Sequence, residues 1–426
     1  MSLALSAEDR ARLSGEQGEV LAFAMDMLVR AGEVLGADKF IDASFAHLDA
    51  CHYYGQVHVD FAKFVVDGGA TVSTPSWTNT VPANPQNPDL RSPEKHGAFL
   101  KGAHELMQLF KQMGCHPVWT CAPYQLPGGP GLGDQIVGSE SNAVTYYNAV
   151  TGARTNKYGD FLDVCCALTG RVPHAGLHIT ENRRATALFT LADNIPYALR
   201  AEEEFAHVLG FYLGKNGTTG IPAIAGLPIS TTHDALKGIS AAVAASGGLQ
   251  MFHAIGVTPE APDLASAFQD TKPEAEHVIT LDMVRQARAD LSPVKEGDLN
   301  MVALGTPHFS YTEFANLMPL IEGTKIANSV TAYISTSRHV KALIEEKGWG
   351  EILERAGWQV IPDTCTYFGP PVEGCVGRVM SNSAKWAYYA PGLLGVEVAF
   401  GSLAECVTSA NAGKLVRDDI KWRVNS

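Results

Sequence analysis

The chain has 426 residues, of which 46% are hydrophobic, so it is long enough for two or three lobes around a sizeable core. Charged residues make up 18%, below the roughly 25% of typical soluble domains, which indicates a large interior or surface hidden in an assembly. The net charge is −13 and no run of Lys or Arg occurs, which argues against nucleic acid and anionic membranes as partners.

Two further exclusions concern location. No apolar stretch reaches the roughly 18 residues of a membrane-spanning helix. The N-terminal segment 1–15 meets acidic residues at once and has no apolar core, so no secretory signal is predicted. The eight cysteines include the adjacent Cys165 and Cys166, and a chain of this length does not need disulfides. We therefore expect a cytoplasmic protein with reduced thiols, some of which are candidate metal ligands.

The first predicted element is an N-terminal helix. Ser6 is a typical N-cap, Asp9 follows it by three residues, and apolar residues recur from Leu13 to Met27. The chain shows no internal repeat and no linker-like tract longer than a loop. The apolar run at 117–119 is expected to be a strand that ends before Cys121.

In the second half, short apolar strands alternate with helices. A helix is expected at 238–246, ended by Gly247 and Gly248, and another at 337–347, with a last helix near the C-terminus. Strands are expected at 249–255, 300–304, 330–334, 358–361, 379–380 and 396–400. This alternation predicts an α/β fold with mainly parallel sheets flanked by helices.

Polar clusters follow four of these predicted strands. They are Cys121, the segment 306–308, Cys365 and the segment 381–383. Ligands in parallel α/β folds gather beyond the carboxyl ends of the strands, so we expect one site assembled from distant segments. His308, at one of these strand ends, is a candidate functional residue for that reason.

Three thiols are candidate metal ligands. Ser402 and Glu405 form a capping-box pattern, so Cys406 is expected in the first turns of a helix, where a thiolate is favoured. Cys121 and Cys365 are expected at strand ends. Their spacing matches no local zinc motif and would suit a metal site held by separate lobes. The alternative is that each is a small buried hydrophobe.

The segment 138–183 is rich in polar residues. Its members are too many for an ordinary helix face, and they include Glu140, Ser141, Asn142, Asn148, Arg154, Thr155 and Asn156. Arg154 is able to hold a substrate carboxylate with two hydrogen bonds. The alternative is a polar network that ties lobes together. The glycine-rich segment 128–133 lacks the Lys-Ser/Thr ending of a P-loop and is predicted to be a loop.

Together these segments resemble one known family. The resembling segments are 120–124, 138–157, 176–178, 181–183, 305–313, 363–365, 379–385 and 402–406, in the family's order from about residue 40 onward. The chain resembles the large, catalytic region of aconitase X, a divergent branch of the aconitase superfamily. It departs from the pattern at Thr306, where some relatives carry a cysteine.

The resemblance implies aconitase-like α/β lobes over the whole chain, 1–426, divided at roughly 1–245 and 246–426. It implies an iron–sulfur cluster of the 2Fe-2S or 3Fe-4S type, or a mononuclear iron, held by Cys121, Cys365 and Cys406. It also implies that the small swivelling domain of the family is absent here and is supplied by a separate subunit, which by analogy contributes a serine as the base.

The resemblance further implies a hydro-lyase that dehydrates cis-3-hydroxy-L-proline, a small hydroxy acid, to Δ1-pyrroline-2-carboxylate. Two alternatives are mevalonate 5-phosphate dehydration and a non-catalytic iron–sulfur binding subunit. Residues expected in catalysis or proton relay are Glu140, His178, Ser381, Ser383 and Lys385. Residues expected to bind substrate are Ser141, Asn142, Arg154, Thr155, Asn156 and His308.

Overall fold

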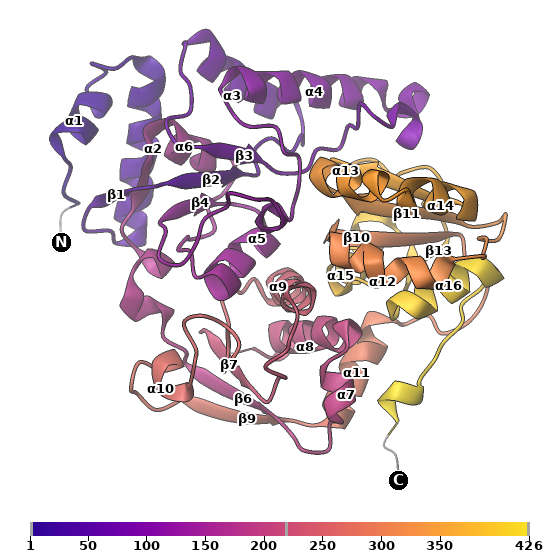
Figure 1. The fold of residues 1–426 in the computed structure, drawn as a ribbon. Helices are drawn as coiled ribbons and strands as arrows, with labels where there is room; N and C mark the ends of the chain where they lie inside the picture. The colour runs from indigo at the N-terminus through magenta and orange to yellow at the C-terminus, as the bar shows by residue number, and fades with distance from the viewer. Residues whose placement is uncertain (1–2, 218–219, 424–426) are drawn as a thin grey trace.

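The chain folds into three lobes, each built around one parallel sheet (Figure 1). The computed structural model describes residues 3–217 and 220–423. One further pair of strands, near the N-terminus, is antiparallel. The expected α/β class, with mainly parallel sheets flanked by helices, is confirmed.

The first lobe carries a three-stranded sheet with helices packed around it. Its elements are α1 (Ala7–Leu13), α2 (Glu19–Leu35), β1 (Phe40–Asp42), β2 (Phe45–Leu48), α3 (Gln56–Asp67), β3 (Ser76–Thr78), α4 (Pro93–Gln112), β4 (Ile136–Gly138), α5 (Ser141–Tyr146), α6 (Leu162–Thr169) and β5 (Arg171–Pro173). The strand order is β3-β2-β4, all parallel, and β1 pairs with β5 apart from this sheet.

The second lobe carries a four-stranded sheet. Its elements are β6 (Ala187–Leu191), α7 (Tyr197–Arg200), α8 (Glu203–Asn216), β7 (Pro222–Ala225), α9 (His233–Gly247), β8 (His253–Ala254), α10 (Leu264–Ala267), β9 (Ala275–Ile279) and α11 (Leu281–Leu291). The strand order is β8-β7-β6-β9, and every pair is parallel.

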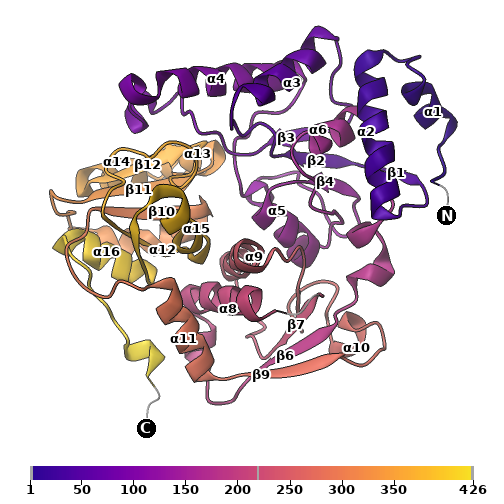
Figure 2. The ribbon, with the colours of Figure 1, turned by 180° about the vertical axis from the view of Figure 1, so that it is seen from behind.

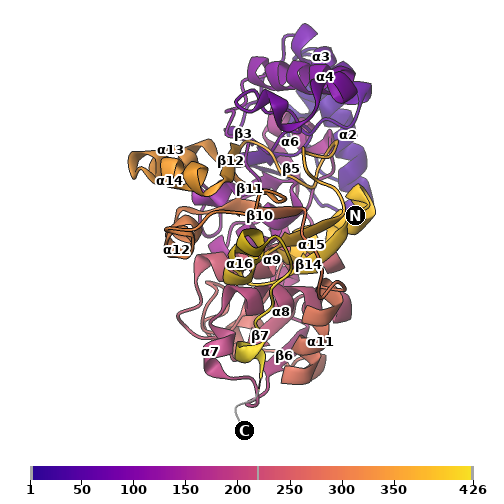
Figure 3. The ribbon, with the colours of Figure 1, turned by 90° about the vertical axis from the view of Figure 1, so that its right-hand side faces the viewer.

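The third lobe carries a five-stranded parallel sheet. Its elements are β10 (Met301–Phe309), α12 (Tyr311–Ile321), β11 (Thr331–Thr336), α13 (Arg338–Glu346), α14 (Trp349–Ala356), β12 (Trp358–Pro362), β13 (Arg378–Ser381), α15 (Ala384–Leu394), β14 (Glu397–Phe400) and α16 (Leu403–Ala412). The strand order is β12-β11-β10-β13-β14. In Figure 3, helices α13, α14 and α12 project to one side of the other two lobes.

Helix α9 lies where the three lobes meet, as Figures 1 and 2 show from opposite sides. It contacts α5 of the first lobe, α8 of its own lobe, and α15 and β10 of the third. Its packing against α8 is close: a Cβ on Gly210 would lie 2.7 Å from the carbonyl oxygen of Ile239. Glycine is required there because two helix backbones approach without room for a side chain.

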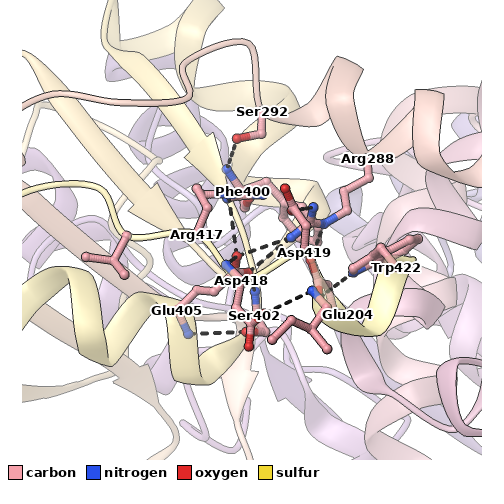
Figure 4. Close-up of polar contacts among 12 residues, drawn as sticks. Glu204, Arg288, Ser292, Phe400, Ser402, Glu405, Arg417, Asp418, Asp419 and Trp422 are labelled. Carbon is pink, nitrogen blue, oxygen red and sulfur yellow. Dashed lines mark hydrogen bonds and ion pairs between the residues drawn. The ribbon is translucent and has the colours of Figure 1, made fainter. Parts of the chain in front are cut away.

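An ion network around the buried Arg288 joins the second lobe to the third and to the C-terminal segment (Figure 4). The guanidinium of Arg288, on α11, donates from Nε to Glu204 at 2.6 Å and from Nη1 to Asp419 at 2.6 Å. Its Nη2 donates to Glu405 of α16 at 3.2 Å. Trp422 donates from its indole to Glu204 at 3.1 Å. These side chains hold the lobes in one arrangement.

Most elements expected from the second half of the sequence are present. The predicted strands 300–304, 330–334, 358–361, 379–380 and 396–400 correspond to β10, β11, β12, β13 and β14, and the predicted helices to α9, α13 and α16. The strand expected at 249–255 is shorter and covers only His253–Ala254. The division expected near residues 245 and 246 falls inside α9, and β7 and β8 on either side of it share one sheet.

Two expectations for the first lobe were wrong. The N-terminal helix predicted from Ser6 is two helices, α1 and α2, because the chain turns at Gly15 and Gly18, with φ of 84° and 101°. The segment 117–119 is not a strand. Pro117 has no N–H for a strand ladder, and Trp119 has a φ of 46°, so the chain turns before Cys121. Among the described residues, no helix is long and apolar enough to cross a membrane.

Candidate functional site

Polar residues at the carboxyl ends of the first-lobe strands form one wall of a cavity. Asp49 follows β2, Asn79 follows β3 and Glu140 lies just beyond β4. Because the three strands are parallel, their ends lie at one edge of the sheet. Side chains of the third lobe complete the cavity, which has a volume of about 300 Å³. They are Tyr367, Phe368, Lys385, Tyr389 and Leu393.

Two buried thiols meet beside this cavity, and one of them, Cys121, lines it. The Sγ atoms of Cys121 and Cys365 lie 3.9 Å apart, one from the first lobe and one from the loop after β12. The hydrogen bond from Cys121 outweighs the burial that opposes the charge on Cys365, and it holds the pKa of Cys365 well below its ordinary value. Burial raises the pKa of Cys121. The pair therefore favours one thiolate and one thiol, with the negative charge on Cys365.

These thiols belong to a group that can hold a metal ion. The ligand atoms of Cys121, His308 and Cys365 all lie within 4.8 Å of one another. The structure does not bring Cys406 to this group. That side chain is fully buried in the hydrophobic core of the third lobe, with Met380 and Ala399 in the same cluster, and burial raises its pKa. Thiolates are ligands typical of iron, zinc and iron–sulfur clusters, so the donors present fit such a group.

Beside the thiols, the first and third lobes are joined by a buried ion pair. Lys385, at the start of α15, donates to the carboxylate of Glu140, and Ser141 Oγ lies 3.4 Å from the same ammonium. Burial opposes the charge on Lys385, but Glu140 outweighs it and holds the pKa of the ammonium well above its ordinary value. Burial also opposes the charge on Glu140, and Lys385 outweighs it and lowers the pKa of that carboxyl. Both groups are therefore charged at neutral pH.

Several cavity residues were missed by the sequence reasoning. They include Asp49, His52, Asn79, Thr80 and Lys157. Burial opposes the charge on Asp49, but His52 and Asn79 outweigh it and lower the pKa of Asp49 to about 2. The signal that would have found Asp49 and Asn79 is the strand-end rule used for the third lobe, since β2 and β3 end directly before them.

Three predicted site residues instead support the cavity wall. Asn142 donates to the carbonyl oxygen of Cys121 at 2.8 Å and accepts from the hydroxyl of Tyr124. Ser383 caps α15 and donates to the carbonyl oxygen of Thr306, and its backbone N–H donates to Ser381 Oγ at 3.1 Å.

Three other predicted site residues are engaged elsewhere. Arg154 donates to Thr180 Oγ1 at 2.7 Å, outside the residues that line the cavity. Asn156 accepts from Leu177 and donates to Ala175, and Thr155 Oγ1 accepts from Gly138.

His178 lies between the hydroxyl of Tyr158 at 2.7 Å and the amide oxygen of Gln135 at 2.6 Å. Burial lowers the pKa of His178 to about 3, so it is neutral. Neither partner nor the imidazole is among the residues that line the cavity.

A larger cavity, of about 590 Å³, lies next to the Arg288 network but offers less chemistry. Two of its guanidinium groups are already occupied: Arg285 donates to the carbonyl oxygen of Trp422 at 2.7 Å and Arg417 lies 3.5 Å from Glu405. Its lining contains no thiol. The smaller cavity, lined by Cys121 and the buried ion pair of Lys385 and Glu140, is therefore the candidate active site.

Models of one known family match most of the chain. The chain matches family models for the aconitase X first domain over residues 2–181, the second domain over 185–289 and the third domain over 299–412. The chain belongs to the aconitase X family.

Individual relatives fall into two groups. The chain is 41% identical to a cis-3-hydroxy-L-proline dehydratase of Pseudomonas aeruginosa, over 96% of this chain and 70% of that protein. It is 38% identical to a cis-3-hydroxy-L-proline dehydratase of Hypocrea jecorina, over 97% of this chain and 69% of that protein. It is 30% identical to the phosphomevalonate dehydratase large subunit of Thermococcus kodakarensis, over 90% of this chain and 94% of that protein.

A solved structure shares the fold. The crystal structure of Thermococcus kodakaraensis aconitase X in its holo-form matches with a TM-score of 0.82 and 28% identity, covering 96% of this chain and 100% of that chain. The expected membership of the aconitase X family is therefore confirmed by sequence and by fold.

Proposed function

We propose that this chain is the large subunit of an iron-dependent hydro-lyase that dehydrates cis-3-hydroxy-L-proline to Δ1-pyrroline-2-carboxylate. The observation that carries the proposal is a single cavity lined by the buried Lys385–Glu140 pair and by Cys121, whose thiol meets that of Cys365. The relatives support it, because identity to the two hydroxyproline dehydratases is 41% and 38%, against 30% to the Thermococcus phosphomevalonate dehydratase subunit.

The cofactor in this proposal is an iron–sulfur cluster of the 2Fe-2S or 3Fe-4S type, or a mononuclear iron. Cys121 and Cys365 would hold it, since both thiols are buried and converge from different lobes. When bound, iron supplies the Lewis acidity that a hydroxide leaving group needs.

Lys385 provides the positive charge for the carboxylate of the substrate. Because its pKa is held well above the ordinary value, this side chain keeps its proton and acts as a cation rather than as a base. Ser141 and Lys157, which also line the cavity, add hydrogen-bond donors beside it. Tyr54, Phe368 and Tyr389 form an aromatic lining that suits a small ring and excludes water.

The dehydration removes a proton from Cα and hydroxide from Cβ of the substrate. The enamine product then tautomerises to the cyclic imine. We assign the proton-abstracting serine to a separate small swivel-domain subunit, and the naming of the phosphomevalonate relatives as large subunits supports such a partner. We also assign the protein to the cytoplasm, which the eight free thiols support.

The test is a paired substrate assay. The chain would be purified anaerobically with its small subunit and offered cis-3-hydroxy-L-proline and mevalonate 5-phosphate in parallel. The control is the same assay with the chain alone. We expect turnover of the first substrate only, and only with both subunits present. Turnover of mevalonate 5-phosphate alone would overturn the substrate assignment. Bound iron with no turnover of either would favour a non-catalytic iron-binding subunit.

A further inference from the structure

The imidazole of His308 reaches both segments that carry the paired thiols. Its Nδ1 lies 2.9 Å from Thr120 Oγ1, and its Nε2 lies 3.1 Å from the carbonyl oxygen of Thr364. Thr120 directly precedes Cys121, and Thr364 directly precedes Cys365. One side chain from β10 thus joins a first-lobe segment to a third-lobe segment, at the residue before each thiol.

The hydrogen-bond partners define the tautomer of this imidazole. A backbone carbonyl only accepts, so the Nε2 atom of His308 carries the proton that it donates to Thr364. In the neutral imidazole, Nδ1 then accepts from the hydroxyl of Thr120. The Thr120 oxygen is free to donate there because its own accepted bond comes from the backbone N–H of Ala122, at 3.1 Å. The side chain of His308 is fully buried, and both ring nitrogens are occupied.

The backbone of His308 is fixed as well. Its N–H donates to Cys121 Sγ at 3.3 Å, and its carbonyl oxygen accepts from Gln125 Nε2 at 3.0 Å. The ammonium of Lys237, which pairs with Asp234 at 3.0 Å and with Glu313, lies 3.5 Å from the same carbonyl oxygen. Lys237 belongs to α9, so the second lobe also contributes to holding this residue.

We propose that His308 is a positioning residue that sets the separation of Cys121 and Cys365, and that its imidazole is not a metal ligand. A nitrogen that carries a proton has no lone pair for a metal, and the lone pair of the other nitrogen is used by Thr120. The proposal rests on iron binding at the two thiols, which is part of the proposed function, but not on the identity of the substrate.

If His308 positions the two thiols, loss of its hydrogen bond with Thr120 should weaken iron binding without abolishing it. His308→Gln keeps an amide donor near the Nε2 position but loses the acceptor for Thr120, while Thr120→Val removes the hydroxyl alone. Each variant leaves both thiols in place, so we expect the dissociation constant for ferrous iron to rise about tenfold, the effect of one lost hydrogen bond. Thr120→Ser keeps the hydroxyl and is the matched control, for which we expect the wild-type constant.

The experiment measures ferrous iron binding by chelator competition under anaerobic conditions, together with nitrogen hyperfine couplings in the electron paramagnetic resonance spectrum of the iron-loaded chain after the bound iron is oxidised to the ferric state. We expect no directly bound histidine nitrogen in the wild-type protein. A strong histidine coupling that disappears in His308→Gln, with iron lost to the extent seen in Cys365→Ser, would overturn the proposal. If His308→Gln does not fold, equal iron affinities of Thr120→Val and Thr120→Ser would overturn it instead.

Iron readouts also separate this proposal from the proposed function. Wild-type iron binding with the expected response in Thr120→Val would support the positioning role even if cis-3-hydroxy-L-proline were not turned over. Failure of the wild-type chain to bind iron under these conditions would contradict both.

Discussion

Lys385 and Glu140 form an ion pair across the junction of the first and third lobes, with both side chains buried in the wall of the candidate active site. Removing two charges from water is costly, and such pairs are often replaceable by apolar residues without loss of stability. The pair is therefore better explained by what it does in the cavity. It keeps a protonated ammonium next to two thiols, where an anionic substrate can bind.

Replacing this ammonium tests its role. Lys385→Met is expected to lower kcat/KM for cis-3-hydroxy-L-proline by roughly 100-fold or more, because the substrate carboxylate loses its cation. It should also lower the free energy of unfolding by about 3–5 kcal/mol, because Glu140 remains buried without a partner. The double variant with Glu140→Gln should recover stability but not activity.

A matched control for this prediction is Lys421→Met. Lys421 pairs with Glu202 at 2.8 Å, and both side chains are exposed, at 60% and 36%. Its loss should change the free energy of unfolding by less than about 1 kcal/mol. Wild-type kcat/KM in Lys385→Met would contradict the assignment of the cation.

We expect substitutions of the three candidate thiols to have different effects on the iron content of the protein. Cys121→Ser and Cys365→Ser are each expected to remove most of the bound iron, since the two Sγ atoms converge at 3.9 Å. Cys406→Ala should leave the iron content unchanged and lower the melting temperature, because Cys406 packs in the third-lobe core. Iron analysis of the anaerobically purified variants decides this, and loss of iron from Cys406→Ala as well as from the other two variants would restore the ligand set expected from the sequence.

Because two histidines are buried, we expect the protein to lose stability in mild acid. Burial lowers the pKa of His178 and of His207 to about 3, below the ordinary 6.5. The unfolded chain therefore binds these protons first as the pH falls below 6.5, and stability is lost from there down to about pH 3. Each histidine should cost about 1.4 kcal/mol between pH 7.5 and pH 5.5.

Denaturant unfolding at pH 7.5 and pH 5.5 measures this effect. The free energy of unfolding should differ less between the two pH values in His178→Gln than in the wild-type protein. The reduction should be about 1.4 kcal/mol, the contribution of one histidine. An unchanged difference in the variant would show that His178 is protonated in the folded protein.

The Arg288 network predicts a stability effect that is separate from the active site. Arg288→Met leaves Glu204 buried without its cation and Glu405 with only Arg417, which should lower the free energy of unfolding by about 3–5 kcal/mol. Iron affinity should not change, because this network lines the other cavity. The control is Arg355→Met, whose pair with Glu351 is exposed at 72% and 81%. Equal unfolding free energies of the two variants would contradict a stabilising role for Arg288.

The sequence predicted the third lobe better than the first, for physical reasons. The third-lobe strands are apolar runs that end in polar residues, and the capping box of Ser402 and Glu405 is present as expected. The cap could not show which face of α16 is buried, and Cys406 lies on the face that packs into the core. The first-lobe strands β2 and β3 are only four and three residues long, too short for a clear alternation, so Asp49 and Asn79 were missed.

In the polar segment 138–183, too, the sequence could not show where each side chain lies. The sequence indicated that this segment was functional, but it could not separate Glu140, which lines the cavity, from Arg154, which turns to Thr180. That distinction depends on which residues pair across lobes, and the partners lie far apart in the chain. Glu140 and Lys385, for example, are separated by 245 positions.

The central claim is that iron held by Cys121 and Cys365 lies in the cavity where cis-3-hydroxy-L-proline is dehydrated. The most direct measurement is the electron paramagnetic resonance spectrum of the iron-loaded chain with its small subunit, recorded before and after addition of this substrate. We predict a substrate-dependent change in the wild-type spectrum and neither bound iron nor turnover in Cys365→Ser. Full turnover by Cys365→Ser, or by protein stripped of iron, would contradict the account.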